Sequence, residues 1–208
     1  MKMSRKRVSH MQLKSVFAML FLTASFPLFS QVAPEAKQGG WPLVVGVGFS
    51  DYYTEMFAKR MEGTTVWTDW NIEHGPSFLR GFGVEAEARL LNFGQPQGQK
   101  LRQGTAGGGP VYTVRHFRNF YPYGKFLLDY AAMDHIKSPR LPPWYTGDTW
   151  TSYAWGGGVE YRARRGVWVR ADYEYQFWRV KFFNPNSFLN PQGVTVGVSY
   201  DFSRIGSH

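Results

Sequence analysis

The chain has 208 residues, a formal net charge of +9 at pH 7, 18% aromatic residues, 23 glycines and no cysteine. Without cysteine it cannot be a disulfide-stabilised module, and its stability must come from burial and backbone pairing. After the N-terminal segment, no stretch approaches the roughly 18 apolar residues of a spanning helix, so a helical membrane protein is excluded.

The first 30 residues predict a cleaved secretory signal. Five basic side chains come before residue 15, an apolar run covers 16–22, and 27–30 offers a cleavage site that ends in the small residue Ser30. The run is far shorter than the roughly 20 residues of a membrane-spanning helix. Losing the five basic side chains lowers the formal charge from +9 to +4, so we expect no nucleic-acid partner. Residues 31–40 read as a short periplasmic leader.

Alternating apolar and polar residues then mark eight predicted strands. They cover 42–51, 64–73, 81–92, 105–117, 123–134, 151–162, 167–178 and 193–202, each close to the 9 to 11 residues of a tilted strand that crosses a bilayer. The connections 52–63, 93–104, 135–150 and 179–192 are long, whereas 74–80, 118–122 and 163–166 are short. Long connections at one end and tight turns at the other are typical of an even-stranded outer-membrane barrel with periplasmic termini.

One face of the predicted strands is charged, with both signs present. In 167–178, Arg170, Asp172 and Glu174 alternate with apolar residues, and Glu85, Glu87 and Arg89 do so in 81–92. If this face is enclosed, eleven charges share a lumen barely wide enough for side chains, and we interpret them as structural ion pairs. A gated ion path or a catalytic carboxylate pair is the alternative. The eleven are Glu85, Glu87, Arg89, Arg115, Lys125, Asp129, Glu160, Arg162, Arg170, Asp172 and Glu174.

The alternation alone also fits a soluble lipocalin-like barrel, whose enclosed face is apolar. The aromatic residues favour the membrane, because two belts of them are expected at the two interfaces of a bilayer. The sequence places Phe49, Tyr52, Tyr53, Tyr153, Tyr175 and Phe177 near the end with long connections, and Tyr121, Tyr123, Tyr161 and Phe202 near the other end.

The last predicted strand is the most specific segment. Thr195, Gly197, Tyr200 and Phe202 resemble the terminal signal of the OmpA/OmpX-type family of small outer-membrane β-barrels, and 156–178 is similar to the family's penultimate hairpin. The resemblance covers about 41–202 and implies recognition by the barrel-assembly machinery. Family members often stop at the terminal aromatic residue, whereas this chain continues through a tail, 203–208.

Few residues suggest catalysis. Asp134, His135 and Ser138 form a short polar cluster in a predicted loop, where an orienter, a base and a nucleophile would lie close together. Such clusters are usually solvated surface. His116 lacks a serine at the spacing found in lipid A deacylases of this shape. No histidine or cysteine spacing suggests a metal site, and we expect no cofactor.

We therefore predict an all-β protein, an eight-stranded antiparallel transmembrane up-and-down β-barrel over 41–202, in the outer membrane of a Gram-negative bacterium. We expect a structural or adhesive role and no enzymatic activity, with outer-membrane lipid and lipopolysaccharide as partners and an extracellular partner for the long loops. The alternatives are a barrel enzyme that modifies outer-membrane lipid and a soluble lipocalin-like periplasmic carrier.

Overall fold

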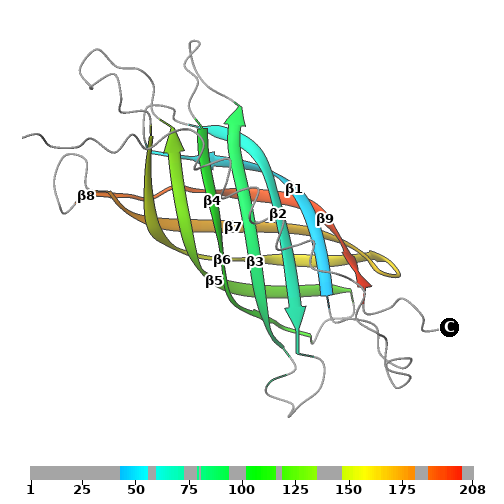
Figure 1. Ribbon diagram of the computed structural model, residues 1–208. Coiled ribbons are helices and arrows are strands. Elements are labelled where there is room, and N and C mark those ends of the chain that lie inside the picture. The colour runs from blue at the N-terminus through cyan, green and yellow to red at the C-terminus, as the bar shows by residue number, and fades with distance from the viewer. Residues whose placement is uncertain are drawn as a thin grey trace, which may run out of the picture. The chain divides into compact units, whose positions relative to one another are not determined.

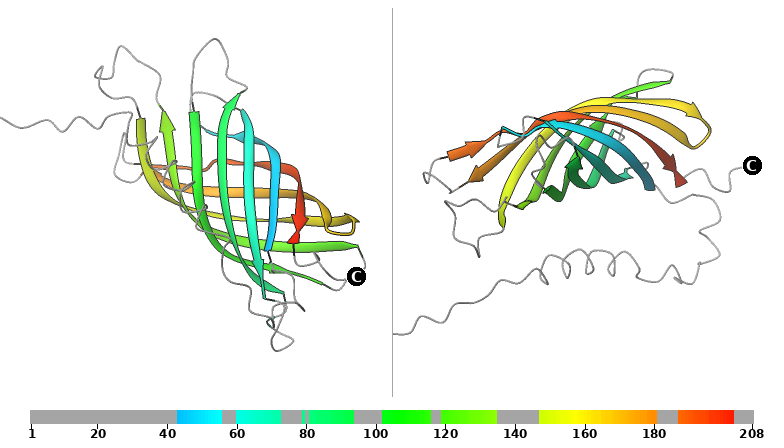
Figure 2. Two further views of the ribbon diagram at one scale, coloured as in Figure 1. Left: turned by 45° about the vertical axis from the view of Figure 1, so that its right-hand side comes forward. Right: turned by 90° about the horizontal axis from the view of Figure 1, so that it is seen from above.

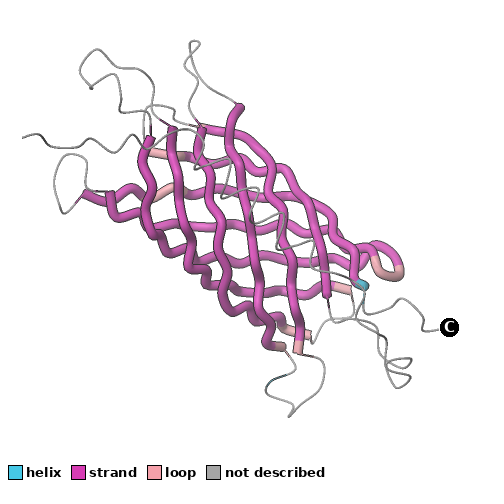
Figure 3. Tube along the Cα trace, in the orientation of Figure 1, coloured by secondary structure: helices cyan, strands magenta, loops and turns pink. Residues whose placement is uncertain are grey.

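A computed structural model describes residues 43–55, 60–72, 79, 81–93, 102–115, 119–134, 147–180 and 187–202. The predicted signal, the leader and the tail lie outside these residues. Strands make up nearly all of the described chain (Figure 3). Among the described residues, no helix is long and apolar enough to cross a membrane.

The described residues form antiparallel strands that close into a barrel (Figures 1 and 2). Each of the strands β1 to β6 pairs with the next, and β9 pairs with β7 on one side and β1 on the other. The predicted eight-stranded barrel is confirmed. The strands are β1 (Leu43–Tyr53), β2 (Met61–Asn71), β3 (Phe82–Phe93), β4 (Arg102–Thr113), β5 (Phe120–Asp134), β6 (Gly147–Arg164), β7 (Val167–Val180), β8 (Ser187–Leu189) and β9 (Gln192–Asp201).

The additional strand β8 is the outer end of the eighth barrel strand. Trp178 of β7 pairs with Leu189, and Tyr175 pairs with Gln192, so β8 and β9 keep one register along β7. Pro191 separates them because it has no N–H to donate to the ladder. Its carbonyl still accepts a hydrogen bond of 2.8 Å from the Gln176 N–H. The sequence prediction began this strand at 193 and missed the extension.

The barrel has two ends, which we name by what lies there. The termini rim is the end where β1 begins and β9 ends, and the loop rim is the opposite end. Strand ends differ from the prediction mainly at the loop rim, where β2 begins at Met61 and β6 at Gly147. As a result the connections are less clearly sorted by length than expected: 72–81, at the termini rim, is longer than 54–60, at the loop rim.

Alternate residues face the lumen and the outside along every barrel strand. In β7 the inward set from Trp168 to Trp178 is buried, while Tyr173 and Phe177 on the opposite face are exposed. In β9, Val194, Val196 and Val198 are exposed in the same way. Apolar side chains therefore cover the outside and polar ones fill the inside, which is the arrangement of a membrane barrel and the inverse of a soluble one.

The lumen fits its large side chains only because neighbouring strands present glycine there. Trp67 on β2 lies against Gly46 of β1, where an added Cβ would overlap the indole ring. Tyr52 on β1 likewise lies against Gly193 of β9. Close approach of side chain to backbone is a recognised reason for glycine within a strand.

We expect Gly46→Val to prevent a stable barrel, because the valine side chain and the Trp67 indole would occupy the same space. Gel mobility of unboiled and boiled protein in mild detergent measures this, since a folded barrel migrates differently before boiling. Trp67→Ala should restore the folded band in the double variant. The outward substitution Val47→Ala is the control, and a folded Gly46→Val band would contradict the packing.

Candidate functional site: the lumen charge network

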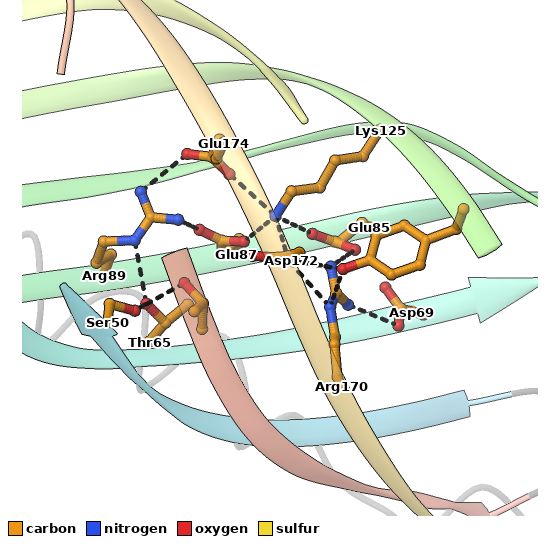
Figure 4. Close-up of polar contacts among 12 residues, drawn as sticks. Ser50, Thr65, Asp69, Glu85, Glu87, Arg89, Lys125, Arg170, Asp172 and Glu174 are labelled. Atoms are coloured by element: carbon orange, nitrogen blue, oxygen red, sulfur yellow. Dashed lines mark hydrogen bonds and ion pairs between the residues drawn. The ribbon is translucent and has the colours of Figure 1, made fainter. Parts of the chain in front are cut away.

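The centre of the lumen holds a network of buried ion pairs (Figure 4). Its members come from strands on opposite sides of the barrel, so the network spans the lumen. Seven of the eleven predicted inward charges belong to it, together with Asp69, which is not among the eleven. We call these eight residues the charge network: Asp69, Glu85, Glu87, Arg89, Lys125, Arg170, Asp172 and Glu174.

Lys125 of β5 lies at its centre, and its side chain is completely buried. The Nζ atom is 2.5 Å from Glu87 Oε2 and 3.1 Å from Glu85 Oε1, both on β3. On the opposite wall it is 2.9 Å from Glu174 Oε2 and 3.3 Å from Asp172 Oδ2 of β7. One ammonium group therefore joins four carboxylates from two facing strands, which requires a lumen narrow enough to bring β3, β5 and β7 together.

Arg170 of β7 organises the part of the network nearer the termini rim. Its Nη2 lies 2.7 Å from Glu85 Oε2, and its Nη1 lies 3.4 Å from Asp69 Oδ2. The guanidinium group stacks on Trp67 and Tyr123, with 4.8 and 4.5 Å from Cζ to the ring centroids. These aromatic faces attract the cation where water is excluded. Arg170 is thus held on several sides at once.

Arg89 of β3 organises the part of the network nearer the loop rim. Its Nη1 is 2.8 Å from Glu174 Oε1, its Nη2 contacts Glu87, and its Cζ lies 4.1 Å from the centroid of Tyr52. The Arg89 Nε donates to the Thr65 hydroxyl at 3.1 Å.

A chain of hydroxyl groups continues from Thr65 across the strands that close the barrel. Ser50 of β1 contacts Thr65 of β2 at 2.5 Å and Thr195 of β9 at 2.8 Å. Hydrogen bonds thus link β1, β2 and β9 to the ion pairs, so the network reaches the seam where the first and last strands meet.

The remaining four predicted charges do not join an ion pair in the described part of the chain. Asp129 is buried, and Glu160 and Arg162 are half-buried toward the termini rim. Arg115 is exposed and follows the end of β4, so it does not face the lumen as predicted. The β4–β5 ladder ends early at Pro122. The Pro122 carbonyl accepts a hydrogen bond of 2.8 Å from the Val114 N–H, but proline has no N–H to donate in return.

The structure also places three residues of the predicted aromatic belts on the lumen side: Tyr52, Tyr123 and the half-buried Tyr121, whose ring packs edge-on against the inward Trp168. Tyr52 is fully buried and Tyr123 nearly so, both beside network residues. Tyr123 lies two positions from Lys125 and therefore points to the same side of the strand. The two-residue alternation of the sequence already indicated this inward position. Asp69 carried the same signal, because it shares its face with Thr65 and Trp67.

An apolar cluster closes the lumen between the network and the loop rim. We call it the apolar cap, and Trp150 and Leu189 pack against it. It excludes water from the loop-rim side, and charge pairs interact more strongly in such a medium. Its members are Tyr52, Met61, Leu91, Ala131, Met133, Trp178 and Val180.

The interior is rich in carboxylates. Its buried charged residues include seven acids against three bases in the described part of the chain. A buried charge is tolerated only when it is paired, so each cation is shared among several acids. The acids are Asp69, Glu85, Glu87, Asp129, Asp172, Glu174 and Asp201, and the bases are Arg89, Lys125 and Arg170.

This arrangement suits stabilisation better than catalysis. No group of three metal-ligating side chains occurs in the described residues. The Ser50 hydroxyl, beside the network, hydrogen-bonds to the hydroxyl groups of Thr65 and Thr195, and neither is a base that could activate it as a nucleophile. His116, His135 and Ser138 lie outside the described residues, and Asp134 ends β5 opposite Gly147.

The residues of the predicted assembly signal lie on β9 and just beyond it. Thr195 and Gly197 face the lumen side, whereas Tyr200 and Phe202 are exposed with ring centroids 5.0 Å apart. The two aromatic rings thus form part of the outer surface at the termini rim. Their recognition by the assembly machinery stays a prediction.

A model of the outer membrane protein β-barrel domain matches residues 20–202. Comparison with curated protein sequences gives no match. Among solved structures, Neisserial surface protein A is similar with a TM-score of 0.57 and 14% identity, covering 79% of this chain and 100% of that chain. Ail of Yersinia pestis, in complex with the heparin analogue sucrose octasulfate, has a TM-score of 0.54 and 16% identity, covering 79% and 99%.

The N-terminal β-barrel domain of Pseudomonas aeruginosa OprF is similar at a TM-score of 0.53 and 14% identity, covering 79% of this chain and 100% of that domain. At such low identity these likenesses concern the fold. Their near-complete coverage of each neighbour shows that the described barrel corresponds to a whole barrel in each of them.

We expect Arg170→Met to destabilise the barrel by about 3 to 5 kcal/mol, because it leaves Asp69, Glu85 and Asp172 buried without their shared cation. Thermal or urea unfolding in detergent micelles measures the change. Arg179→Met, at an exposed position of the same strand, is the matched control. Equal stability of the two variants would show that the ion pairs do not hold the barrel together.

Asp69→Asn should act in the opposite direction and stabilise by about 1 kcal/mol. It removes one of the surplus buried carboxylates and keeps an oxygen for Arg170 Nη1. The unfolding midpoint measures the change, and Asp51→Asn at the loop rim, whose partner Arg60 is exposed, should change it by less than about 0.5 kcal/mol. A large loss of stability in Asp69→Asn would contradict the view that the Asp69 carboxylate is one of more buried acids than the three bases need.

Proposed function

Because the chain belongs to the outer membrane protein β-barrel domain family, we propose that it is a surface-interaction protein of the bacterial outer membrane. In this proposal the barrel is a closed, rigid scaffold. The connections at the loop rim face the exterior and contact a partner there. The closed interior is the observation that carries the proposal.

The interior supports this role because buried side chains of the described strands fill it. The charge network crosses the lumen at its centre, and the apolar cap lies between the network and the loop rim. An eight-stranded barrel has room for side chains and little else. A function in transport would require both layers to move, so the outer surface is the better place to look for activity.

The outer wall supports a role within the bilayer. Exposed aromatic residues lie toward both rims, with apolar residues between them, as at the two interfaces of a membrane. Toward the loop rim they include Phe49, Tyr53, Tyr130, Tyr153 and Phe177, and toward the termini rim Trp70, Phe82, Tyr112, Phe120, Tyr161 and Tyr200.

The two alternatives receive less support. A lipocalin-like carrier needs an apolar enclosed face, and here the enclosed face carries the charge network. A lipid-modifying barrel enzyme needs a nucleophile beside a base at the lipid-facing rim. The five histidines all lie outside the described residues, and the geometry of the network favours neither acid–base nor nucleophilic chemistry.

A polyanionic glycan is the partner class that we propose for the loops. The connections at the loop rim and their flanks carry Lys59, Lys100, Lys137, Arg140 and Lys181 in the sequence. Basic side chains attract sulfated or phosphorylated polymers over a distance of about 10 Å at moderate salt. The similar barrel Ail was solved with a heparin analogue, which supports testing this class first.

We expect the protein in bilayer nanodiscs to bind heparin, and replacement of these five basic residues by Gln to weaken binding at least about tenfold. Isothermal titration or biolayer interferometry measures the affinity at two salt concentrations. The matched control replaces the neutral loop residues Gln95, Gln97 and Asn186 by Ser. No binding by the unmodified protein, or equal binding by the Gln variant, would show that the loops do not recognise polyanions.

A further inference from the structure

The barrel wall has fewer hydrogen bonds between β4 and β5 than the length of these strands allows. Their ladder pairs Gly108 with Leu128 and Val111 with Lys125, but it skips 109 and 110. On the other side of β4 the ladder to β3 continues through the same two positions without a break. The interruption therefore belongs to the junction of β4 and β5, which we call the β4–β5 seam and which joins 102–114 to 122–134.

Two prolines that face the opposite strand account for the missing hydrogen bonds. The Thr113 N–H donates to the Gly81 carbonyl on the β3 side at 2.8 Å, and the Val114 N–H donates to the Pro122 carbonyl on β5 at 2.8 Å. Successive residues of a strand direct their N–H groups to opposite neighbours, so the nitrogen of Pro110, four residues before Val114, points to β5. Because proline has no N–H, Pro110 and Pro122 each leave the seam one donor short.

Glycines allow the two strands to stay close without these bonds. An added Cβ at Gly109 would overlap the Phe126 carbonyl oxygen, and one at Gly107 would overlap the Leu128 carbonyl oxygen. The β5 backbone thus lies directly against the β4 backbone, an approach that glycine permits. Gly104 of the same strand differs, because the nearest atom to an added Cβ there is 3.7 Å away. A side chain at 109 would push the seam apart, whereas one at 104 would not.

A buried ion-pair bridge crosses the seam on the lumen side (Figure 4). The Nζ of Lys125 on β5 lies 3.1 Å from Glu85 Oε1 and 2.5 Å from Glu87 Oε2, both on β3. Opposite these two acids, β4 presents Gly109 and Gly107, which place no side chain in the way. The bridge therefore fixes β5 to β3 although β4 lies between them in the sheet.

We propose that the β4–β5 seam is the part of the wall that opens before the others, and that the bridge from Lys125 to Glu85 and Glu87 limits this opening. Local opening costs least where few backbone hydrogen bonds must break. In lipid each unpaired backbone group is costly, so a seam with missing donors needs another interaction to stay closed. This flexible side of the scaffold is independent of what the loops bind.

Hydrogen–deuterium exchange of the full mature protein in bilayer nanodiscs, followed by mass spectrometry of its peptides, measures the opening. We expect amides of 106–114 and 122–128 to exchange at least about tenfold faster than those of the β1–β2 ladder. Pro110→Val with Pro122→Val supplies the two missing donors and should slow exchange at the seam at least about fivefold. Equal rates in the two ladders of the unmodified protein, or no slowing in the double variant, would overturn the proposal.

Gly109→Ala tests the close approach in the opposite direction. Its methyl group would displace the Phe126 carbonyl, so exchange at the seam should become at least about fivefold faster. Gly104→Ala on the same strand is the matched control and should leave the rate unchanged. Unboiled gel mobility shows which variants are folded. Equal seam exchange in the two alanine variants is an outcome that the proposal does not survive.

The bridge is tested by comparing Lys125→Met with Arg170→Met. Both remove a buried cation, but the first breaks the link from β5 to β3 and the second breaks a link from β7 to β3. Lys125→Met should therefore speed exchange at the β4–β5 seam more than in the β1–β2 ladder, and Arg170→Met should not. Glu87→Gln weakens the same bridge and serves if Lys125→Met does not fold. The same exchange pattern in the β5 and β7 variants would show that the bridge does not hold the seam.

Discussion

The pairing of Lys125 with four carboxylates from facing strands is the interaction on which the rest of the barrel depends. A charge buried alone would cost more than the whole stability of a domain, so the acids are tolerable only because the cation lies among them. This requires β3 and β7 to stand close together across the lumen. The barrel diameter, the number of strands and the side chains that fill the lumen therefore depend on one another.

That constraint explains the uneven distribution of side chains around the barrel. Strands β2, β3, β5 and β7 carry most of the large and charged inward residues, whereas β1, β4, β6 and β9 contribute most of the inward glycines. Two strands with large inward side chains can face each other because the strands between them leave space. The glycines on these inward faces thus follow from the need to fill a narrow lumen.

The sequence predicted the features that depend on the two-residue period of a strand. It missed the features that depend on where each strand begins and ends. Strand number, the outward apolar face and most network residues follow from alternation, which a strand imposes on every side chain. Arg115 was misplaced because the end of β4 depends on the hydrogen bonding at Pro122, which the period does not reveal. Tyr52 was misplaced because β1 runs two residues beyond its predicted end at 51. The β8 extension was missed because Pro191 interrupts a strand that its neighbour β7 keeps in register.

The network and the apolar cap also separate the barrel's stability from its exterior. Every ion pair of the charge network lies between inward side chains, and the cap covers them toward the loop rim. The loop-rim pair of Arg60 and Asp51 is exposed and contributes little by comparison. Because the interior supplies the stability, the connections at both rims are free to carry charge for other purposes.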